Sequence, residues 1–453
     1  MKIVVVSIYN IGNETGTAKV SERLSKQLSY NNEVMYLCLG RKYSLKTVNN
    51  LTILTVPSAP ISGVQVPKIT PKTIENIKRD LSKFAPDVVH SQNIFFISLI
   101  ALIWAKKNNV PFIVTFHSFP SEGISYVFPK FTKGKIISTI DFKLTSSYVR
   151  RFLKNVDLII ALNEHVVRSV RKITKDTPVT IINNGIDLNA FYNITAKAPY
   201  KRVNFVYLGS YVGRKNQEFL VRAFGHLPKN YHLDLYGNPD SGKYYVKKLK
   251  KIITERNIKN VKINGFLNQK GVYRALHKSH FFVSASIKEV QSLVIIEALA
   301  SGVPVIALNN ETVDEAIDRQ NGLVLSKNIT TREFAKKLKV YVKNTSKDYE
   351  KVSFYCRESV IRFDLNNVAN EIVQAYKLAI KYKRSQRLNK KKEGMILTQV
   401  NKLIPKQYED LYLKSKKYAS EDRPYYLRFI LSVTIAISAV ISSIAYIISK
   451  VKR

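Results

Sequence analysis

Residues Ser284 to Ala307 read SASIKEVQSLVIIEALASGVPVIA, and this stretch indicates the fold class of the chain. Phe281–Ser284 is a short apolar run of the kind that forms a buried strand, and Val303–Ala307 is a second one. Between them, Leu293–Ala300 has the composition of a buried helix, and Gly302 suits the left-handed residue that follows a helix end. A strand, a helix and a second strand in this order predict a parallel α/β unit.

The polar residues of this stretch predict a binding site at the start of the helix. Gln291 and Ser292 can cap a helix that begins at about Leu293. Free N–H groups at Ser292 and Leu293 would then form an anion site, where the helix dipole favours a phosphate. Glu297 can accept hydrogen bonds from vicinal hydroxyls such as those of a ribose. Glu289, on the entering loop, would project toward whatever is attached to that phosphate.

The alternation of strands and helices extends along the chain in two series. In the first series, apolar runs predict strands at Lys2–Ser7, Val34–Leu39, Leu51–Val56, Val88–His90, Phe112–His117, Leu158–Leu162 and Val179–Asn183, with helices at Ala18–Leu28, Ile74–Phe84 and Ile94–Lys107. The second series adds strands at Phe205–Leu208, His232–Tyr236 and Val261–Asn264, with helices at Glu218–Phe224, Tyr244–Arg256, Val272–His277 and Val368–Lys381. Strands this apolar predict parallel sheets that helices cover on both faces.

The fold class that follows is α/β, with two Rossmann-like doubly wound domains that face each other across a cleft. We expect an N-terminal domain at residues 1–190 and a C-terminal domain with a closing helix at residues 191–382. A basic linker is expected at residues 383–427 and a transmembrane helix at residues 428–449. Ligands of open α/β sheets bind beyond the carboxyl ends of the strands, so loops of both domains would line the cleft.

The two glutamates carry a resemblance to a known family. Glu289, seven residues, Glu297 and then an Ala-x-Ala-x-Gly-x-Pro-Val run resemble the signature of glycosyltransferase family 4, whose members are retaining enzymes with the GT-B fold. Other family elements follow in the family's order. Gly209–Asn216 resembles the phosphate-binding loop, Asn183–Asp187 the hinge element, and Val88–His90 and Val114–His117 the strand ends of the N-terminal domain. The resemblance spans residues 1 to 380 or so and implies a two-domain fold of the kind described above.

The resemblance implies a role for each matching residue of the donor site. Lys215, with Arg214 beside it, would bind the donor diphosphate and stabilise the leaving group. Glu289 would hold hydroxyls of the donor sugar, and Glu297 would hold the nucleotide ribose. Front-face attack assisted by the donor phosphate is implied as well, because no enzymic nucleophile is evident.

The N-terminal domain would contribute two further residues. Gly16, in the loop from Gly12 to Thr17, would let the backbone approach the diphosphate. His117 would contact the sugar near the reacting carbon. His90 is better explained as a structural histidine at a strand end.

One position departs from the family pattern. The family often has an arginine directly after the glycine that matches Gly209, and here that residue is Ser210. Either Arg214 takes over, or Lys215 and the backbone hold the diphosphate alone. The departure leaves the number of cations at the site open.

Motifs of several other enzyme classes are absent from the sequence. Without an Asp-x-Asp, a metal-dependent glycosyltransferase lacks its carboxylate pair. Without Gly-x-Gly-x-x-Gly after the first strand or a Gly-x4-Gly-Lys-Ser/Thr, dinucleotide oxidoreductases and P-loop NTPases are unsupported. No spaced His/Cys cluster suggests zinc. We therefore expect a metal-independent hexosyltransferase with no cofactor besides its nucleotide-sugar co-substrate.

The charge and the C-terminal segment predict a membrane protein. The formal net charge of +40 predicts a polyanionic partner. Phe429–Ile448 has no charged residue over 20 positions, enough for a helix of about 30 Å, the thickness of the bilayer core. The preceding Lys381–Arg428 holds 14 lysine and arginine residues against five acidic ones. These cations favour an anionic membrane surface and a catalytic body on the cytoplasmic side of the cell membrane. A helix in the interface and a buried core helix are the alternatives.

A basic and aromatic segment of the N-terminal domain predicts a lipid acceptor. Its cations are Lys130, Lys133, Lys135, Lys143, Arg150, Arg151 and Lys154, and its apolar residues are Tyr126, Phe128, Phe131, Ile136, Ile137, Phe142 and Phe152. Such a composition is typical of a membrane-surface patch, although a solvent-facing basic surface is the alternative. The acceptor would be a diacylglycerol-type lipid or a polyprenyl-phosphate-linked glycan precursor.

Two rival functions remain open at this point. A nucleotide-sugar epimerase of the same two-domain fold would consume the donor without an acceptor. A basic protein without catalysis that binds nucleic acid or membranes would explain the charge, but no recognised RNA- or DNA-binding motif is present. We therefore expect a nucleotide-sugar donor and a lipid or lipid-linked acceptor as partners, and no nucleic acid.

Overall fold

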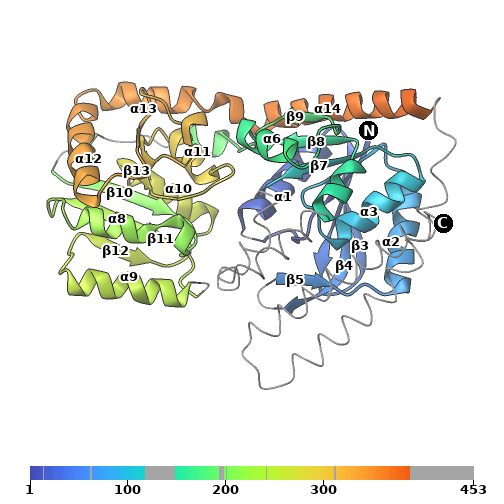
Figure 1. The fold of residues 1–453 in the computed structure, drawn as a ribbon, viewed down its shortest axis with the longest axis horizontal. Coiled ribbons are helices and arrows are strands. Elements are labelled where there is room, and N and C mark those ends of the chain that lie inside the picture. Colours follow the sequence, from blue (N-terminus) through green and yellow to red (C-terminus); the bar gives the residue numbers. More distant parts are fainter. Residues whose placement is uncertain are drawn as a thin grey trace, which may run out of the picture. The chain divides into compact units, whose positions relative to one another are not determined.

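The structure, a computed structural model, describes residues 1–13, 15–61, 64–117, 148–192, 198–199, 201–240, 242–310 and 313–387 (Figure 1). The chain divides into two compact units. Unit 1 comprises Met1–Ile182 and the chain from Ala369 onward, and unit 2 comprises Asn183–Val368. Each unit is built on a central sheet and is described by itself.

Unit 1 contains a nine-stranded sheet and its helices. Its strands are β1 (Lys2–Val6), β2 (Glu33–Gly40), β3 (Ser44–Val48), β4 (Leu51–Ile61), β5 (Val64–Pro67), β6 (Val88–Ser91), β7 (Phe112–Phe116), β8 (Leu158–Ala161) and β9 (Val179–Ile181). Its helices are α1 (Gly16–Ser29), α2 (Pro71–Phe84), α3 (Phe96–Lys107), α6 (Glu164–Arg171) and most of α14 (Leu365–Arg387), with a further helical stretch at residues 148–154.

The order of the strands in unit 1 is β3-β4-β2-β1-β6-β7-β8-β9, with β5 paired to β4. All these pairs are parallel except those that β3 and β5 make with β4. The chain adds strands outward from β1 on one side of the sheet and outward from β6 on the other. The order of strand addition therefore reverses between β1 and β6, although these two strands are parallel. Ligands of doubly wound sheets bind at such a switch point, beyond the carboxyl ends of the strands.

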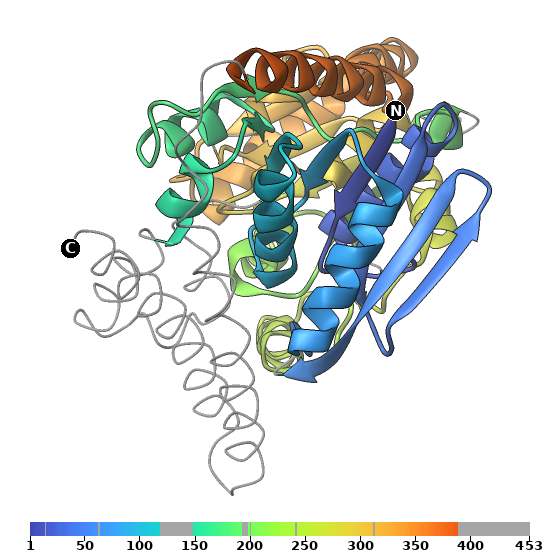
Figure 2. The same ribbon diagram turned by 90° about the vertical axis from the view of Figure 1, so that its right-hand side faces the viewer.

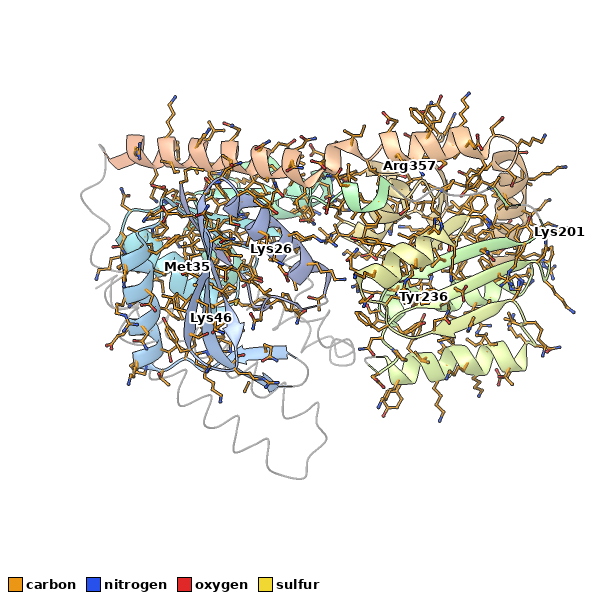
Figure 3. All side chains as sticks on the ribbon, turned by 180° about the vertical axis from the view of Figure 1, so that it is seen from behind. Lys26, Met35, Lys46, Lys201, Tyr236 and Arg357 are labelled. Carbon is orange, nitrogen blue, oxygen red and sulfur yellow. The ribbon has the colours of Figure 1, made fainter. Side chains whose placement is uncertain are left out.

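The helices of unit 1 cover a sheet whose central strands are buried. Figure 2 shows α2 and α3 side by side on one face of this sheet. Met35 of β2 lies among the packed side chains of the unit (Figure 3), as its 2% exposure requires. Helix α2 begins at Pro71 behind the N-cap Thr70, whose hydroxyl accepts a hydrogen bond from the backbone of Thr73, and it ends at the left-handed Ala85.

Two buried polar contacts fasten α14 to unit 1. The hydroxyl of Tyr376 lies 2.6 Å from Nδ1 of His90, at the end of β6. The ammonium of Lys383 lies 2.6 Å from the carboxylate of Asp157, and both side chains are at most 10% exposed. The same carboxylate accepts a hydrogen bond from the backbone N–H of Phe112, at the start of β7.

Unit 2 contains a six-stranded sheet. Its strands are β10 (Val203–Leu208), β11 (Tyr231–Tyr236), β12 (Val261–Asn264), β13 (Phe281–Ser284), β14 (Val305–Leu308) and β15 (Gly322–Leu325). Its helices are α7 (Asn189–Tyr192), α8 (Gln217–Phe224), α9 (Lys243–Glu255), α10 (Gln269–His277), α11 (Leu293–Ala300), α12 (Thr331–Thr345) and α13 (Tyr349–Glu358), with 3-10 turns η2 (Gly213–Lys215), η3 (Val313–Glu315) and η4 (Ile361–Phe363).

The sheet of unit 2 has the order β12-β11-β10-β13-β14-β15, and its pairs are parallel. Numbered along the chain, this is the 3-2-1-4-5-6 order of the Rossmann fold. The order in which the chain adds strands to the sheet reverses between β10 and β13. The loops that follow these two strands are therefore the expected site of ligand binding in unit 2.

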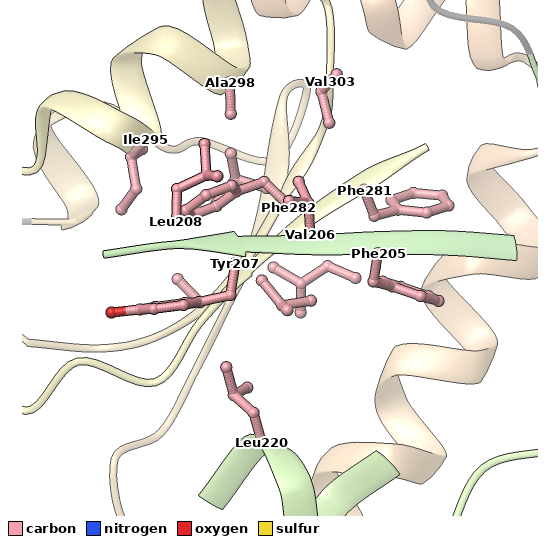
Figure 4. Close-up of a cluster of buried hydrophobic side chains, with 14 of the residues drawn as sticks. Phe205, Val206, Tyr207, Leu208, Leu220, Phe281, Phe282, Ile295, Ala298 and Val303 are labelled. Atoms are coloured by element: carbon pink, nitrogen blue, oxygen red, sulfur yellow. The ribbon is translucent and has the colours of Figure 1, made fainter. Parts of the chain in front are cut away.

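The core of unit 2 explains why β10 holds this central position. In Figure 4, the side chain of Tyr207 of β10 lies on the same side of the strand as Leu220 of α8. The side chain of Leu208 of β10 lies on the other side, together with Ile295 and Ala298 of α11. All five side chains are at most 3% exposed. Because successive side chains of a strand point to opposite faces, the apolar run of β10 packs against α8 and α11 at once.

Two segments near the ends of unit 2 are paired with each other. Ile186 pairs with Asp364 in a parallel bridge, and the backbone N–H of Leu365 donates to the carbonyl of Ile186 at 2.9 Å. A Cβ at Gly185 would lie 2.9 Å from the Cα of Leu365. Only a glycine therefore lets these two segments approach each other so closely.

The structure changes several details of the expected organisation. The first crossing falls between Ile182 and Asn183 rather than at residue 190, and α14 belongs to unit 1 from Ala369 onward. Lys383, expected to begin the basic linker, is instead a buried residue of α14 that pairs with Asp157. None of the helices in the described ranges is both long enough and apolar enough to cross a bilayer. The predicted span at Phe429–Ile448 lies outside the described residues.

The expected basic and aromatic patch is described only in part. Residues 118–147, which hold most of its members, lie outside the described ranges. Phe152 is not a surface residue: it is 3% exposed and packs edge-on against Phe112, with ring centroids 5.9 Å apart. Arg150 and Lys154 of the same helical stretch are exposed.

Candidate active site

The predicted donor-site residues of unit 2 lie on the two loops at its switch point. Gly209, Arg214 and Lys215 follow β10, and Glu289 follows β13. The loops are joined by their backbones, because the N–H of Ile287 donates to the carbonyl of Arg214 at 2.8 Å. The strand order thus brings Glu289 close to Lys215 and Arg214, which precede it by 74 and 75 positions in the chain.

Glu289 forms an ion-pair cluster with both predicted cations. Its carboxylate pairs with the ammonium of Lys215 and lies 3.5 Å from the guanidinium of Arg214. The side chains of Glu289 and Lys215 are 9% and 12% exposed, so this pair is largely desolvated. Within a partly buried site, paired charges stabilise each other more strongly than they would on the surface. Two cations and one carboxylate therefore form a single charged cluster at the switch point of unit 2.

Arg214 places its side chain at the Glu289 carboxylate. Its guanidinium lies beside the Glu289 carboxylate and also contacts the carbonyl of Lys288 at 3.4 Å. Ser210 uses its carbonyl to accept a hydrogen bond from Gln217 at 2.8 Å. Two cations therefore border this site in the described part of unit 2.

Position 209 requires a glycine because its backbone packs directly against the Tyr207 side chain. A Cβ at Gly209 would lie 2.7 Å from the Tyr207 hydroxyl, and the residue has a φ of +157°. The hydroxyl of Tyr207 is buried and has no hydrogen-bond partner among the described residues. Burial and the neighbouring Glu289 carboxylate raise the pKa of Tyr207 well above its ordinary value. Sequence reasoning missed this tyrosine because its apolar neighbours mark it as core.

Helix α11 begins at Leu293, as the sequence predicts, but it is not capped as expected. Ser292 occupies the N-cap position without a side-chain hydrogen bond to the helix. The Gln291 side chain turns away from the helix and accepts a hydrogen bond from the backbone N–H of Asn184 at 2.8 Å. The first N–H groups of a helix have no intrahelical acceptor, so this start can donate to an anion.

Glu297 lies in the middle of α11 and is 6% exposed. Its backbone carbonyl accepts hydrogen bonds from the N–H and the hydroxyl of Ser301 at 3.1 and 2.9 Å. Two carboxylates, those of Glu289 and Glu297, are therefore buried on either side of the helix start. Neither points into bulk solvent from the outer shell of unit 2.

In unit 1, the loop after β1 holds the predicted Gly16. Helix α1 begins at Gly16, and the preceding Gly12 has a φ of +83°. The N–H of Gly12 donates to the Glu22 carboxylate of α1 at 2.7 Å, which ties the loop to its own helix. A Cβ at Gly16 would meet nothing within 4 Å. The described protein alone therefore does not require a glycine at that position.

His117 follows β7 and bonds to a residue that sequence reasoning missed. Its Nε2 lies 2.7 Å from the amide oxygen of Gln92, which follows β6. Burial lowers the pKa of His117 to about 4. Gln92 could have been suspected from its place two residues after His90 at a strand end, although nothing in the sequence pairs it with His117.

His90 is structural, as the sequence indicates. It is fully buried, and its ring nitrogens contact the hydroxyls of Tyr376 and Thr115 at 2.6 and 2.7 Å. Burial and the nearby His117 lower its pKa to about 3, so the ring stays neutral. In the described part of the chain, no group of His, Cys, Asp and Glu residues is arranged to hold a metal ion.

Comparison with known proteins identifies the family. The model of the family described as Glycosyltransferase Family 4 matches residues 15–190, and that of Glycosyl transferases group 1 matches residues 195–358. The chain belongs to glycosyltransferase family 4. It is a glycosyltransferase, and its two Rossmann-like units have the GT-B fold.

Several relatives and solved structures resemble this family 4 chain. The alpha-monoglucosyldiacylglycerol synthase of Acholeplasma laidlawii is 26% identical over 56% of this chain and 67% of its own. The synthase of the same name from Streptococcus pneumoniae is 22% identical over 67% of this chain and 70% of its own. Sucrose-phosphate synthase from Thermosynechococcus elongatus superposes with a TM-score of 0.67 at 19% identity, covering 84% of this chain and 99% of its own. The Anabaena protein HepE, in complex with UDP and glucose, superposes with a TM-score of 0.62 at 15% identity over 83% of this chain and all of its own.

Proposed function

We propose that this glycosyltransferase moves a hexose from a nucleoside-diphosphate sugar to a hydroxyl of a membrane lipid, with retention of the anomeric configuration and without a metal. The observation that carries the proposal is the cluster of Glu289, Lys215 and Arg214 at the switch point of unit 2, next to the start of α11. Cations and a carboxylate at one place suit a ligand that is both phosphorylated and hydroxylated.

The chemistry follows from where charge develops. As the glycosidic bond to the donor phosphate breaks, negative charge grows on the leaving diphosphate. Lys215 and Arg214, together with the N–H groups at the start of α11, would neutralise that charge. Glu289 would turn from the cations toward the sugar hydroxyls when the phosphate takes its place. Glu297 would accept hydrogen bonds from the ribose.

The lipid acceptor rests on two separate supports. Two relatives are named as synthases of a glucosyldiacylglycerol, which makes a diacylglycerol-type acceptor the first to test. The apolar sequence at Phe429–Ile448, behind a basic stretch, would hold the enzyme at an anionic membrane, with its catalytic body on the cytoplasmic side. A polyprenyl-linked glycan is the second acceptor to test.

The test is a donor screen that follows release of nucleoside diphosphate. The full chain is mixed with nucleotide sugars and with vesicles that contain or lack diacylglycerol, all in EDTA. We expect release that needs both donor and diacylglycerol, and a glycolipid product with the anomeric configuration of the donor. Strict metal dependence would refute the mechanism, and donor conversion without any acceptor would indicate an epimerase instead.

A further inference from the structure

A chain of buried polar side chains leads from α14 to His117 in unit 1. The hydroxyl of Tyr376 contacts Nδ1 of His90 at 2.6 Å, and the hydroxyl of Thr115 contacts its Nε2 at 2.7 Å. The amide nitrogen of Gln92 lies 3.2 Å from the same Nε2, and its amide oxygen lies 2.7 Å from Nε2 of His117. Gln92 is 2% exposed, so its amide must find its partners inside the protein.

The contact with Gln92 determines the tautomer of His117. An amide oxygen can only accept a hydrogen bond, so Nε2 of His117 must carry the proton. A neutral imidazole carries a single proton, which leaves Nδ1 as an acceptor. Burial lowers the pKa of His117 to about 4, so the ring is neutral at pH 7.

Gln92 is itself held firmly in place. Its backbone N–H donates to the carbonyl of Val6 at 2.9 Å, which fixes it to the end of β1. It therefore lies at the switch point between β1 and β6, where ligands of unit 1 are expected. The titratable group that contacts the Gln92 amide is His90 of β6, which in turn contacts the hydroxyl of Tyr376 of α14. In the described ranges, no carboxylate contacts the His117 ring.

We propose that Gln92 is a positioning residue, which holds His117 as the Nε2–H tautomer so that Nδ1 accepts a hydrogen bond from a hydroxyl of the donor sugar. The inference rests on the proposed function and on the family resemblance, which implies that His117 contacts the donor sugar. Gln92 itself need not touch the substrate.

Two variants of the full chain separate positioning from a structural role. Gln92→Leu removes the acceptor, and we expect kcat to fall roughly 10- to 100-fold while the KM for the acceptor lipid changes little. Gln92→Glu keeps an acceptor but places a carboxylate beside the imidazole, which raises the pKa of His117. Its activity should approach that of the parent at pH 8 and fall as the pH drops, because a protonated ring cannot accept. Gln320→Glu, the same change at an exposed residue, is the control.

Nitrogen-15 NMR of protein that carries labelled histidine reports the tautomer of each imidazole directly. The measurement does not depend on enzymatic activity. The parent should show the Nε2–H form of His117, and Gln92→Glu should show a raised pKa for that ring. An unchanged pKa in Gln92→Glu, or parent turnover in Gln92→Leu, would overturn the inference. So would parent turnover in His117→Ala. If the parent transfers no sugar at all, the proposed function fails, while the NMR result still reports whether Gln92 sets the tautomer.

Discussion

At the scale of single residues, Glu289 is the centre of the proposed donor site, because its carboxylate pairs with Lys215 and lies beside Arg214. The spacing between Glu289 and Glu297 led to the prediction that both carboxylates lie at a binding site near the start of α11. In the structure both residues are buried near that helix start. The pairing of Glu289 with Lys215 was beyond prediction, because it depends on how β10 and β13 align in the sheet.

Replacing Glu289 tests this pairing. In Glu289→Gln, Lys215 loses its carboxylate partner, so we expect a nucleoside diphosphate, with UDP as the first probe, to bind at least as tightly as to the parent. Turnover should fall roughly 100-fold, because the sugar hydroxyls lose a charged acceptor. Calorimetric titration with UDP and the nucleoside-diphosphate release assay measure the two effects. Glu255→Gln, on the exposed face of α9, is the matched control. Parent turnover in Glu289→Gln would remove this residue from the site.

At the scale of elements, α14 shows how a tertiary contact can extend a helix into a segment whose composition predicts a linker. Its sequence beyond residue 381 looks like the start of a basic linker, yet the helix continues to Arg387 because Lys383 finds a buried partner in Asp157. A charge that is buried with its partner costs little, whereas the same charge left alone is expensive.

We expect Lys383→Met to loosen α14. The variant leaves the Asp157 carboxylate buried with the Phe112 N–H as its remaining partner, which should cost about 3 kcal/mol. Hydrogen exchange of the α14 amides, followed by mass spectrometry, should show lost protection. Lys381→Met changes an exposed lysine of the same helix and should leave exchange as it is. Equal protection in both variants would mean that the ion pair does not fasten the helix.

The alternating strands and helices were largely predictable, because their apolar runs carry the signal. Strands at the edge of the sheet were not: β3 is mostly exposed and joins β4 through the left-handed Asn49, a hairpin whose sequence is too polar to stand out. Helix α12 was missed although Thr330 and Glu333 form a capping box at its start. That spacing is a local signal and could have been read. Contacts such as that of His117 with Gln92 arise only from the fold.

At the scale of the whole molecule, we propose that the excess of basic residues serves the binding of an anionic partner. Ion pairs such as those of Glu218 with Arg222 and Lys248 neutralise a few of these charges. The net charge of +40 nevertheless remains and favours an anionic membrane.

Truncation separates anchoring from catalysis. A chain that ends at residue 427 lacks the apolar sequence, and we expect it to leave the vesicle pellet at high salt but to stay bound at low salt, because its basic surface remains. It should still glycosylate detergent-dispersed diacylglycerol. A chain that ends at residue 449 keeps the apolar sequence and serves as the control. Sedimentation of the shorter chain with vesicles at high salt would refute a membrane anchor at this end.

The close approach at Gly185 has a mechanical consequence. Ile186 is hydrogen-bonded to the segment that leads into α14, and both segments belong to unit 2. A Cβ at residue 185 would lie 2.9 Å from the Cα of Leu365, so a Gly185→Ala change would force these two backbone segments apart.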